Sequence, residues 1–118
     1  MRFQTYKGKD IPPVLKQICS QRAHLPEGIA KDRFRWSPED IRKAIVVFEG
    51  NQIIAWSVIV NQHCRISPPF LDIWAWTRWT HRKRGIARRC VYLAKRGYSR
   101  SELCHYKHPE GFWRKVGL

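Results

Sequence analysis

Acidic side chains are scarce in this chain, which holds nine Asp and Glu residues against 23 Lys and Arg residues and carries a formal net charge of +14. Between Ile73 and Ser101 there is no acidic residue at all, although nine basic residues lie in that interval. A field of one sign repels a small polyamine and attracts polyanions. The scarcity of acids therefore favours an anionic macromolecular partner, either nucleic acid or an acidic protein face. A basic surface that only keeps the protein soluble is the alternative.

The sequence also lacks any apolar run approaching the roughly 20 residues that a membrane-spanning helix needs. The first residues, Met1 to Gln4, begin no apolar signal-peptide core. We therefore expect no membrane partner and a cytoplasmic location. No repeat, linker or low-complexity tract divides the 118 residues, and their 43% hydrophobic content suffices for one core. The chain is predicted to form a single domain over residues 1–118.

No two cysteines form a Cys-x-x-Cys pair, which favours reduced thiols over a disulfide framework. The four cysteines are Cys19, Cys64, Cys90 and Cys104. The nearest approach to a zinc-ligand set combines His63 and Cys64 with Cys104, His105 and His108. Adjacent residues on a strand point to opposite faces, so these side chains converge poorly on one ion. We therefore expect no metal site.

Hydrophobic periodicity and turn residues predict an alternation of strands and helices. The expected strands cover residues 1–6, 44–48, 53–60, 71–77 and 101–106. Two further helices are expected to begin near Pro12 and near Ser37, and two helices are expected over residues 84–96 and 110–116. The turn at Glu49 to Gln52 joins two of these strands into a hairpin. The strand, helix, strand order from residue 71 to residue 106 implies a parallel strand pair.

A basic glycine turn, Arg82-Lys83-Arg84-Gly85-Ile86-Ala87, follows the apolar strand at 71–77 and leads into the helix at 84–96. Backbone N–H groups at a helix start point outward, and the helix dipole favours an anion there. Glycine allows the backbone to approach a ligand closely because it carries no Cβ. The order of strand, basic turn and helix is therefore typical of a phosphate-binding cradle.

This turn resembles the acyl-CoA-binding motif Arg/Gln-x-x-Gly-x-Gly/Ala of the GCN5-related N-acetyltransferase (GNAT) family, with Arg82, Gly85 and Ala87 at its fixed positions. The last residues, 111–118, are similar to the family's Phe-Tyr-x-x-x-Gly-Phe segment, with Trp113 in place of Tyr and Leu118 in place of Phe. The hairpin before the cofactor strand is a third shared element. The resemblance covers about residues 44–118. It implies an α+β fold with a mixed, mostly antiparallel sheet, a parallel splayed strand pair and flanking helices.

The resemblance implies acetyl-CoA as co-substrate, held in the splay between the strand at 71–77 and the strand after the helix. The pantetheine arm would run along the backbone of the strand's end, and the basic turn would wrap the pyrophosphate with N–H groups. The residues carried over to this cofactor site are Trp76, Thr77, Arg78, Arg82, Lys83, Arg84, Gly85, Ile86, Ala87, Arg88 and Trp113. Plain surface charge is the alternative role for the arginines of the turn and helix.

Acyl transfer from a thioester to an amine requires a base for the amine and benefits from an acid for the thiolate. The sequence departs from the family here, because the indole of Trp113 cannot donate a proton as a tyrosine does. The usual acid is therefore either missing or supplied by Tyr106 or His105. Asp72 is the only acid on the cofactor strand and therefore the candidate base. A solvated strand-end residue, or an ion-pair partner of an arginine, is the alternative role for Asp72.

The resemblance implies an acetyl-CoA-dependent N-acetyltransferase, and the basic charge indicates a macromolecular acceptor: a protein amine, a charged tRNA or a modified nucleic acid. The alternative is a non-catalytic module that binds nucleic acid or a protein through the basic face and exposed tryptophans. Family members usually continue with further strands beyond the segment that ends here at Leu118. Either this is a short, C-terminally minimal member, or a homodimer completes that wall of the substrate groove.

Overall fold

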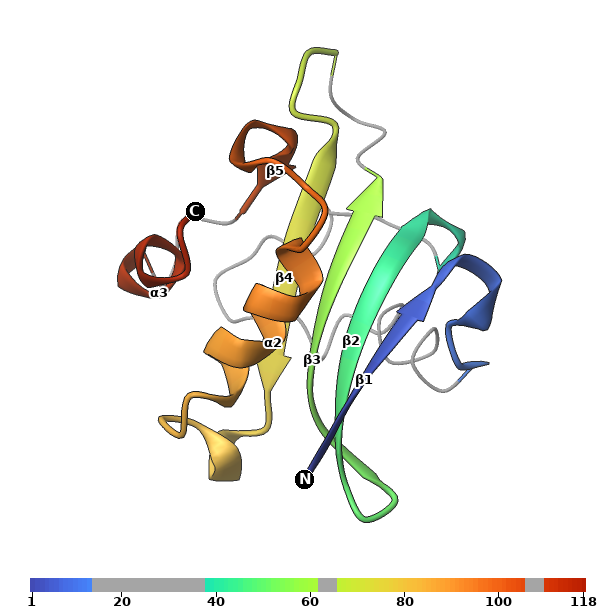
Figure 1. Cartoon of the computed structure of the whole chain (residues 1–118), viewed down its shortest axis with the longest axis vertical. Helices are drawn as coiled ribbons and strands as arrows, with labels where there is room; N and C mark the ends of the chain where they lie inside the picture. Colours follow the sequence, from blue (N-terminus) through green and yellow to red (C-terminus); the bar gives the residue numbers. More distant parts are fainter. Residues whose placement is uncertain (14–37, 62–65, 106–109) are drawn as a thin grey trace.

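The computed structural model describes residues 1–13, 38–61, 66–105 and 110–118, which form a five-stranded sheet with helices packed on it (Figure 1). The strands follow the chain order β1 (Arg2–Lys7), β2 (Ile41–Glu49), β3 (Gln52–Asn61), β4 (Leu71–Thr77) and β5 (Leu103–Cys104). Neighbouring strands are antiparallel up to β4, whereas β4 and β5 are parallel. The protein therefore has an α+β fold with a mixed, mostly antiparallel sheet, as the sequence predicts.

The longest described helix, α2 (Ile86–Lys95), covers one face of the sheet, and the short α3 (Glu110–Lys115) lies near the C-terminus (Figure 1). Alternation along the strands divides the core in two. On the α2 face, Ile45 and Ile73 pack with helix residues such as Val91. On the opposite face, Trp56 and Trp74 pack with apolar residues of β2 and β3. Both sides of the central strands are therefore buried, which explains their nearly continuous apolar sequence.

The predicted elements are largely confirmed where the structure describes them. Strand β4 has the expected bounds, β3 exceeds its prediction by one residue at each end, and α2 begins at Ile86 because Gly85 takes a left-handed conformation with φ 76°. Strand β2 begins three residues early, and its register is irregular between Ile41 and Lys43. The short helix expected at Ser37 is the 3-10 helix η3 (Pro38–Asp40). The helix expected near Pro12 lies outside the described residues.

The strand expected over 101–106 is wrong at its start, since β5 begins only at Leu103. Its first residues belong to the 3-10 helix η5 (Arg100–Glu102), which a capping box between Ser99 and Glu102 closes. The Ser99 backbone N–H donates to Glu102 Oε1 at 2.8 Å, and this bond is the main reason that the pKa of Glu102 is lowered. The capping box competes with the sheet for these residues and shortens the parallel pair.

Lys43 is buried on β2 and fastens the end of α2 to the sheet. Its Nζ donates to the Leu93 carbonyl at 2.8 Å and to the Arg96 carbonyl at 3.1 Å. These carbonyls belong to the last turn of α2, where a lysine supplies the donors that the helix itself lacks. Burial, together with the nearby charges of Lys7 and Arg96, lowers the pKa of Lys43.

We expect Lys43→Met to lower the free energy of unfolding by about 1–2 kcal/mol at pH 7, because the two carbonyls are left without their donor. The folded pKa is below the unfolded value, so the unfolded state binds more protons as the pH rises toward the ordinary pKa of 10.5. The wild type should therefore gain stability relative to Lys43→Met over that alkaline window. Urea denaturation of both proteins at several pH values measures the difference, and a difference that shrinks with rising pH contradicts this account.

None of the helices in the described part of the chain is long and apolar enough to cross a membrane. Among the described residues, Cys90 forms no disulfide, and no group of three or more potential metal ligands occurs. His63, Cys64 and His108 of the potential zinc set lie outside the described residues. Cys90 packs in the α2-side core, and burial raises the pKa of its thiol.

Candidate functional site

The edge of β4 that faces β5 is paired only at its beginning. Leu71 and Asp72 pair with Leu103 and Cys104, and no described strand pairs with that edge from Ile73 to Thr77. The other edge of β4 is paired with β3 along its whole length. Backbone polar groups along the open stretch can therefore pair with an extended ligand, in the manner of an added strand.

This open edge leads into the basic turn and the start of α2, which lie at the opposite end of β4 from β5 (Figure 1). Two residues of the turn take positive φ values, Lys83 at 65° and Gly85 at 76°. The N-cap residue of α2 is Gly85, which has no side chain to cap the helix, and the N–H of Arg89 donates to the Gly85 carbonyl at 3.1 Å as the first turn closes. The amides that precede Arg89 have no partner inside the helix. They are donors available to an anion.

The side chains of the turn place positive charge around these amides. Arg82, Lys83, Arg84 and Arg88 are exposed, whereas Ile86 is buried and anchors the helix start in the core. Arg82 Nε donates to the Thr77 carbonyl at 3.2 Å, so this arginine links the turn to the end of β4. A Cβ at Gly85 would meet no atom within 4 Å, which shows that the backbone there faces open space.

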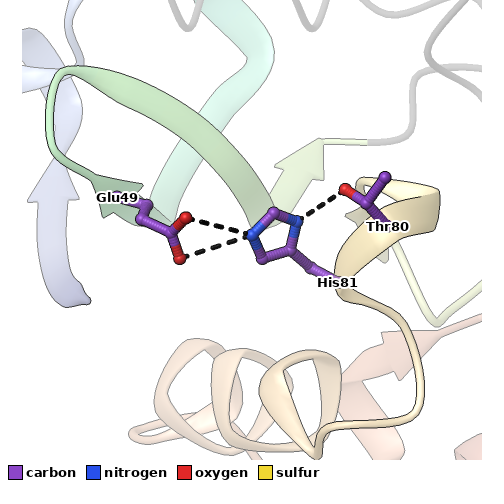
Figure 2. A network of polar contacts seen from close by, with 3 residues as sticks. All are labelled: Glu49, Thr80 and His81. Atoms are coloured by element: carbon purple, nitrogen blue, oxygen red, sulfur yellow. Dashed lines mark hydrogen bonds and ion pairs between the residues drawn. The ribbon is translucent and has the colours of Figure 1, made fainter.

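A small polar network fastens the turn to the β2–β3 hairpin (Figure 2). His81, in the 3-10 helix η4 (Trp79–His81), directs Nε2 toward the Glu49 carboxylate at 3.3 Å and Nδ1 toward Thr80 Oγ1 at 2.8 Å. The imidazole is mostly buried, and Glu49 is about half exposed. The network thus joins residues that are more than 30 positions apart and holds η4 in place.

We expect His81→Ala to increase the amide exchange rates of His81 and Arg82 by about 2- to 5-fold, because an exposed ion pair or hydrogen bond contributes little more than that. These amides close η4 by donating to the Arg78 and Trp79 carbonyls. Hydrogen exchange followed by NMR measures the change. Thr80→Val should have a smaller effect because it leaves the Glu49 contact intact. Equal exchange rates in His81→Ala and wild type would show that the His81–Glu49 contact does not hold η4 in place.

The cofactor residues expected at the end of β4 differ in burial. Trp76 and Arg78 are half-buried, and Thr77 is buried with its hydroxyl lacking a hydrogen-bond partner in the described part of the chain. The Arg78 guanidinium lies against the side-chain amide of Gln52. Trp76 stacks on Trp56 with ring centroids 6.2 Å apart, on the face opposite α2.

The Arg78 N–H donates to the Ile54 carbonyl at 2.8 Å and the Arg78 carbonyl accepts from the His81 N–H, so the backbone of Arg78 is already paired. The Thr77 carbonyl accepts from Arg82, and the Trp76 backbone faces Trp56 on β3, which leaves the Thr77 N–H toward the open edge.

The candidate catalytic residues are not gathered on one face. Asp72 is buried, so a solvated strand-end residue is the wrong alternative for it. It alternates along β4 with the residues of the α2 face and shares the opposite face with Trp74. His105 instead stacks on Trp113, with ring centroids 5.1 Å apart, and Trp113 packs in the α2-side core. Tyr106 lies outside the described residues.

Trp113 is buried, and its indole N–H lacks a hydrogen-bond partner among the described residues. The ring is enclosed by His105 and by Phe112, whose centroid is 5.0 Å away. Among the described tryptophans, Trp79 is the one that is highly exposed, at 77%. Trp56, Trp74 and Trp113 are buried, so they are not among the exposed tryptophans that a binding module would use.

Sequence reasoning missed Tyr92, which is 52% exposed in the middle of the basic face of α2. This residue neither belongs to the apolar stripe nor carries charge, so neither pattern points to it. Its position three or four residues from Arg88, Arg89, Lys95 and Arg96 is visible in the sequence and could have identified it.

Comparisons of the chain with protein-family models, with curated proteins and with solved structures give no significant match.

Proposed function

We propose that the protein is an acetyl-CoA-dependent N-acetyltransferase that acts on an amine of a macromolecular acceptor, and that its fold is of the GNAT type. One observation carries the proposal: the open edge of β4, from Ile73 to Thr77, leads into an uncapped helix start through a basic turn. An open strand edge accepts an extended amide-containing arm, and uncapped helix amides accept a diphosphate. Coenzyme A contains both groups.

The residues present fit this ligand. The Thr77 N–H, which faces away from β3, would pair with the pantetheine arm, and the amides from Gly85 to Arg88 would hold the pyrophosphate. Lys83 and Gly85 have positive φ values, and backbone of this kind can direct successive N–H groups toward one anion. The exposed cations Arg82, Arg84 and Arg88 would neutralise the phosphates. Coenzyme A supplies the activated acetyl thioester to this site.

In the transfer itself, a C–N bond forms to the acceptor amine while the C–S bond to the thiolate breaks. The amine must lose a proton, and Asp72 is our candidate to receive it, directly or through water. A thiolate is a good leaving group, so the reaction does not require a strong acid. His105 and Tyr106 remain the candidate proton donors. Trp113 is proposed only to line the cofactor site.

A non-catalytic, coenzyme-binding or nucleic-acid-binding module is the second candidate. The observation that favours it is the placement of Asp72 and Trp113 in cores on opposite faces of the sheet. A buried indole at the position of the family's tyrosine supplies no proton. A homodimer also stays a prediction.

Incubation with labelled acetyl-CoA separates the two candidates. Protein and RNA pools are offered as acceptors, and mass spectrometry locates the label. We expect the wild type to place acetyl groups on amines of one pool, and we expect the Gly85→Glu variant to acetylate that pool much more slowly. Binding of acetyl-CoA with no labelled acceptor in either pool would favour the non-catalytic module.

A further inference from the structure

The exposed face of α2 carries an aromatic ring at the centre of a group of positive charges. Arg88 and Arg89 lie one turn before Tyr92, and Lys95 and Arg96 lie one turn after it. Residues three and four apart share a helix face, so all four cations surround the ring. No acidic residue stands between Ile73 and Ser101 to neutralise them. This basic face spans about 12 Å along the helix axis, from the rise per residue.

Contacts with other elements hold two of these cations in place. The Arg89 guanidinium lies 4.7 Å from the centroid of Phe3 on β1. Lys95 Nζ donates to the Val116 carbonyl at 2.6 Å and lies 4.8 Å from the centroid of Tyr92. Lys95 is consequently half-buried. Cations that are already held in place give up less side-chain entropy on binding than free ones.

We propose that this face binds single-stranded nucleic acid, with Tyr92 stacking on a base and the surrounding cations contacting the phosphates. A single strand offers phosphates and unstacked bases alternately along its length, which matches a ring between cations. A duplex keeps its bases stacked on one another and leaves Tyr92 without a partner. An acidic protein surface would pair with the cations but offers the ring no stacking surface. The proposal does not depend on acetyl transfer.

The test measures fluorescence anisotropy of a labelled single-stranded 12-nucleotide uridine RNA, and of a 12-base-pair RNA duplex, with the full chain. We expect tighter binding of the single strand. Tyr92→Leu should weaken single-strand binding by about 5- to 50-fold, and Tyr92→Phe should stay within about twofold of wild type. Circular dichroism establishes that each variant is folded.

Charge pairs provide the matched control. Arg88→Gln combined with Arg89→Gln should reduce the slope of log Kd against log salt by about 1.4, since each phosphate of a single strand that a cation neutralises contributes about 0.7. Arg2→Gln combined with Lys9→Gln also removes two exposed charges, including an arginine that lies over a phenylalanine ring, away from α2. That control pair should leave the slope unchanged.

Three results would overturn the proposal: duplex binding as tight as single-strand binding with no effect of Tyr92→Leu, equal slopes in the two charge-pair variants, or no RNA binding together with binding of polyglutamate. Each measurement is made with and without acetyl-CoA. Single-strand binding by a protein that does not bind acetyl-CoA would support this inference and contradict the proposed acetyltransferase, so the two can fail separately.

Discussion

Replacing Gly85 with glutamate should lower the affinity for acetyl-CoA by at least about 100-fold. The new carboxylate would stand among the helix-start amides and repel the pyrophosphate, and the side chain would strain a residue whose φ is 76°. Among the described residues, a Cβ at this position meets no atom within 4 Å, so the first side-chain atom fits without a clash. Isothermal titration calorimetry with acetyl-CoA measures the change.

Gly97→Glu is the matched control for this variant. Gly97 follows the other end of α2, has a φ of 87° and also has no atom within 4 Å of a Cβ. The same backbone strain and charge are thus introduced away from the proposed cradle. Its acetyl-CoA affinity should stay within about threefold of wild type. Equal reductions of affinity in both variants would point to a general effect of strain or charge and would count against the Arg82–Arg88 turn as the binding site.

Asp72→Asn should lower acetyl transfer by about 100-fold or more while changing acetyl-CoA affinity little. The amide keeps the size of the side chain, which matters because Asp72 is buried, but it cannot accept a proton from the amine. Initial rates over pH 6–9 provide the measurement, with the label-accepting pool as substrate. Thermal denaturation of the variant establishes that the buried site still folds.

The opposite-face placement of Asp72 and Trp113 makes this experiment informative. A rate that is unchanged at every pH would assign Asp72 a structural role and leave the base among residues outside the described part of the chain. Asp10→Asn removes an exposed acid on a separate element and should leave the rate as in wild type.

The central elements could be predicted from the sequence because their patterns are unambiguous. Strand β4 alternates between two cores, and α2 combines an apolar stripe with a glycine at each end. The length of β5 could not be predicted, because Ser99 and Glu102 form a capping box that a strand pattern does not reveal. Local side-chain bonding outweighs the tendency of residues 101 and 102 to extend.

The basic turn could also be predicted, since glycine and the strand before it fix the helix start. The surroundings of the candidate site's side chains could not be predicted from the sequence. The sequence contains no sign that Asp72 is buried, because a strand-end acid is exposed or buried according to what covers its face. The His81–Glu49 contact joins distant segments and has no local signal (Figure 2). The same holds for the packing of His105 on Trp113.

The central claim, that the open β4 edge and the start of α2 form one coenzyme-binding site, is tested most directly by titrating the ¹⁵N-labelled protein with acetyl-CoA and following its backbone amides by NMR. The account predicts that the largest shifts fall together on Thr77 at the end of β4 and on Gly85 to Arg88, with amides on β1 unchanged. Shifts confined to one of the two segments, or no shifts at a saturating concentration of acetyl-CoA, would contradict it.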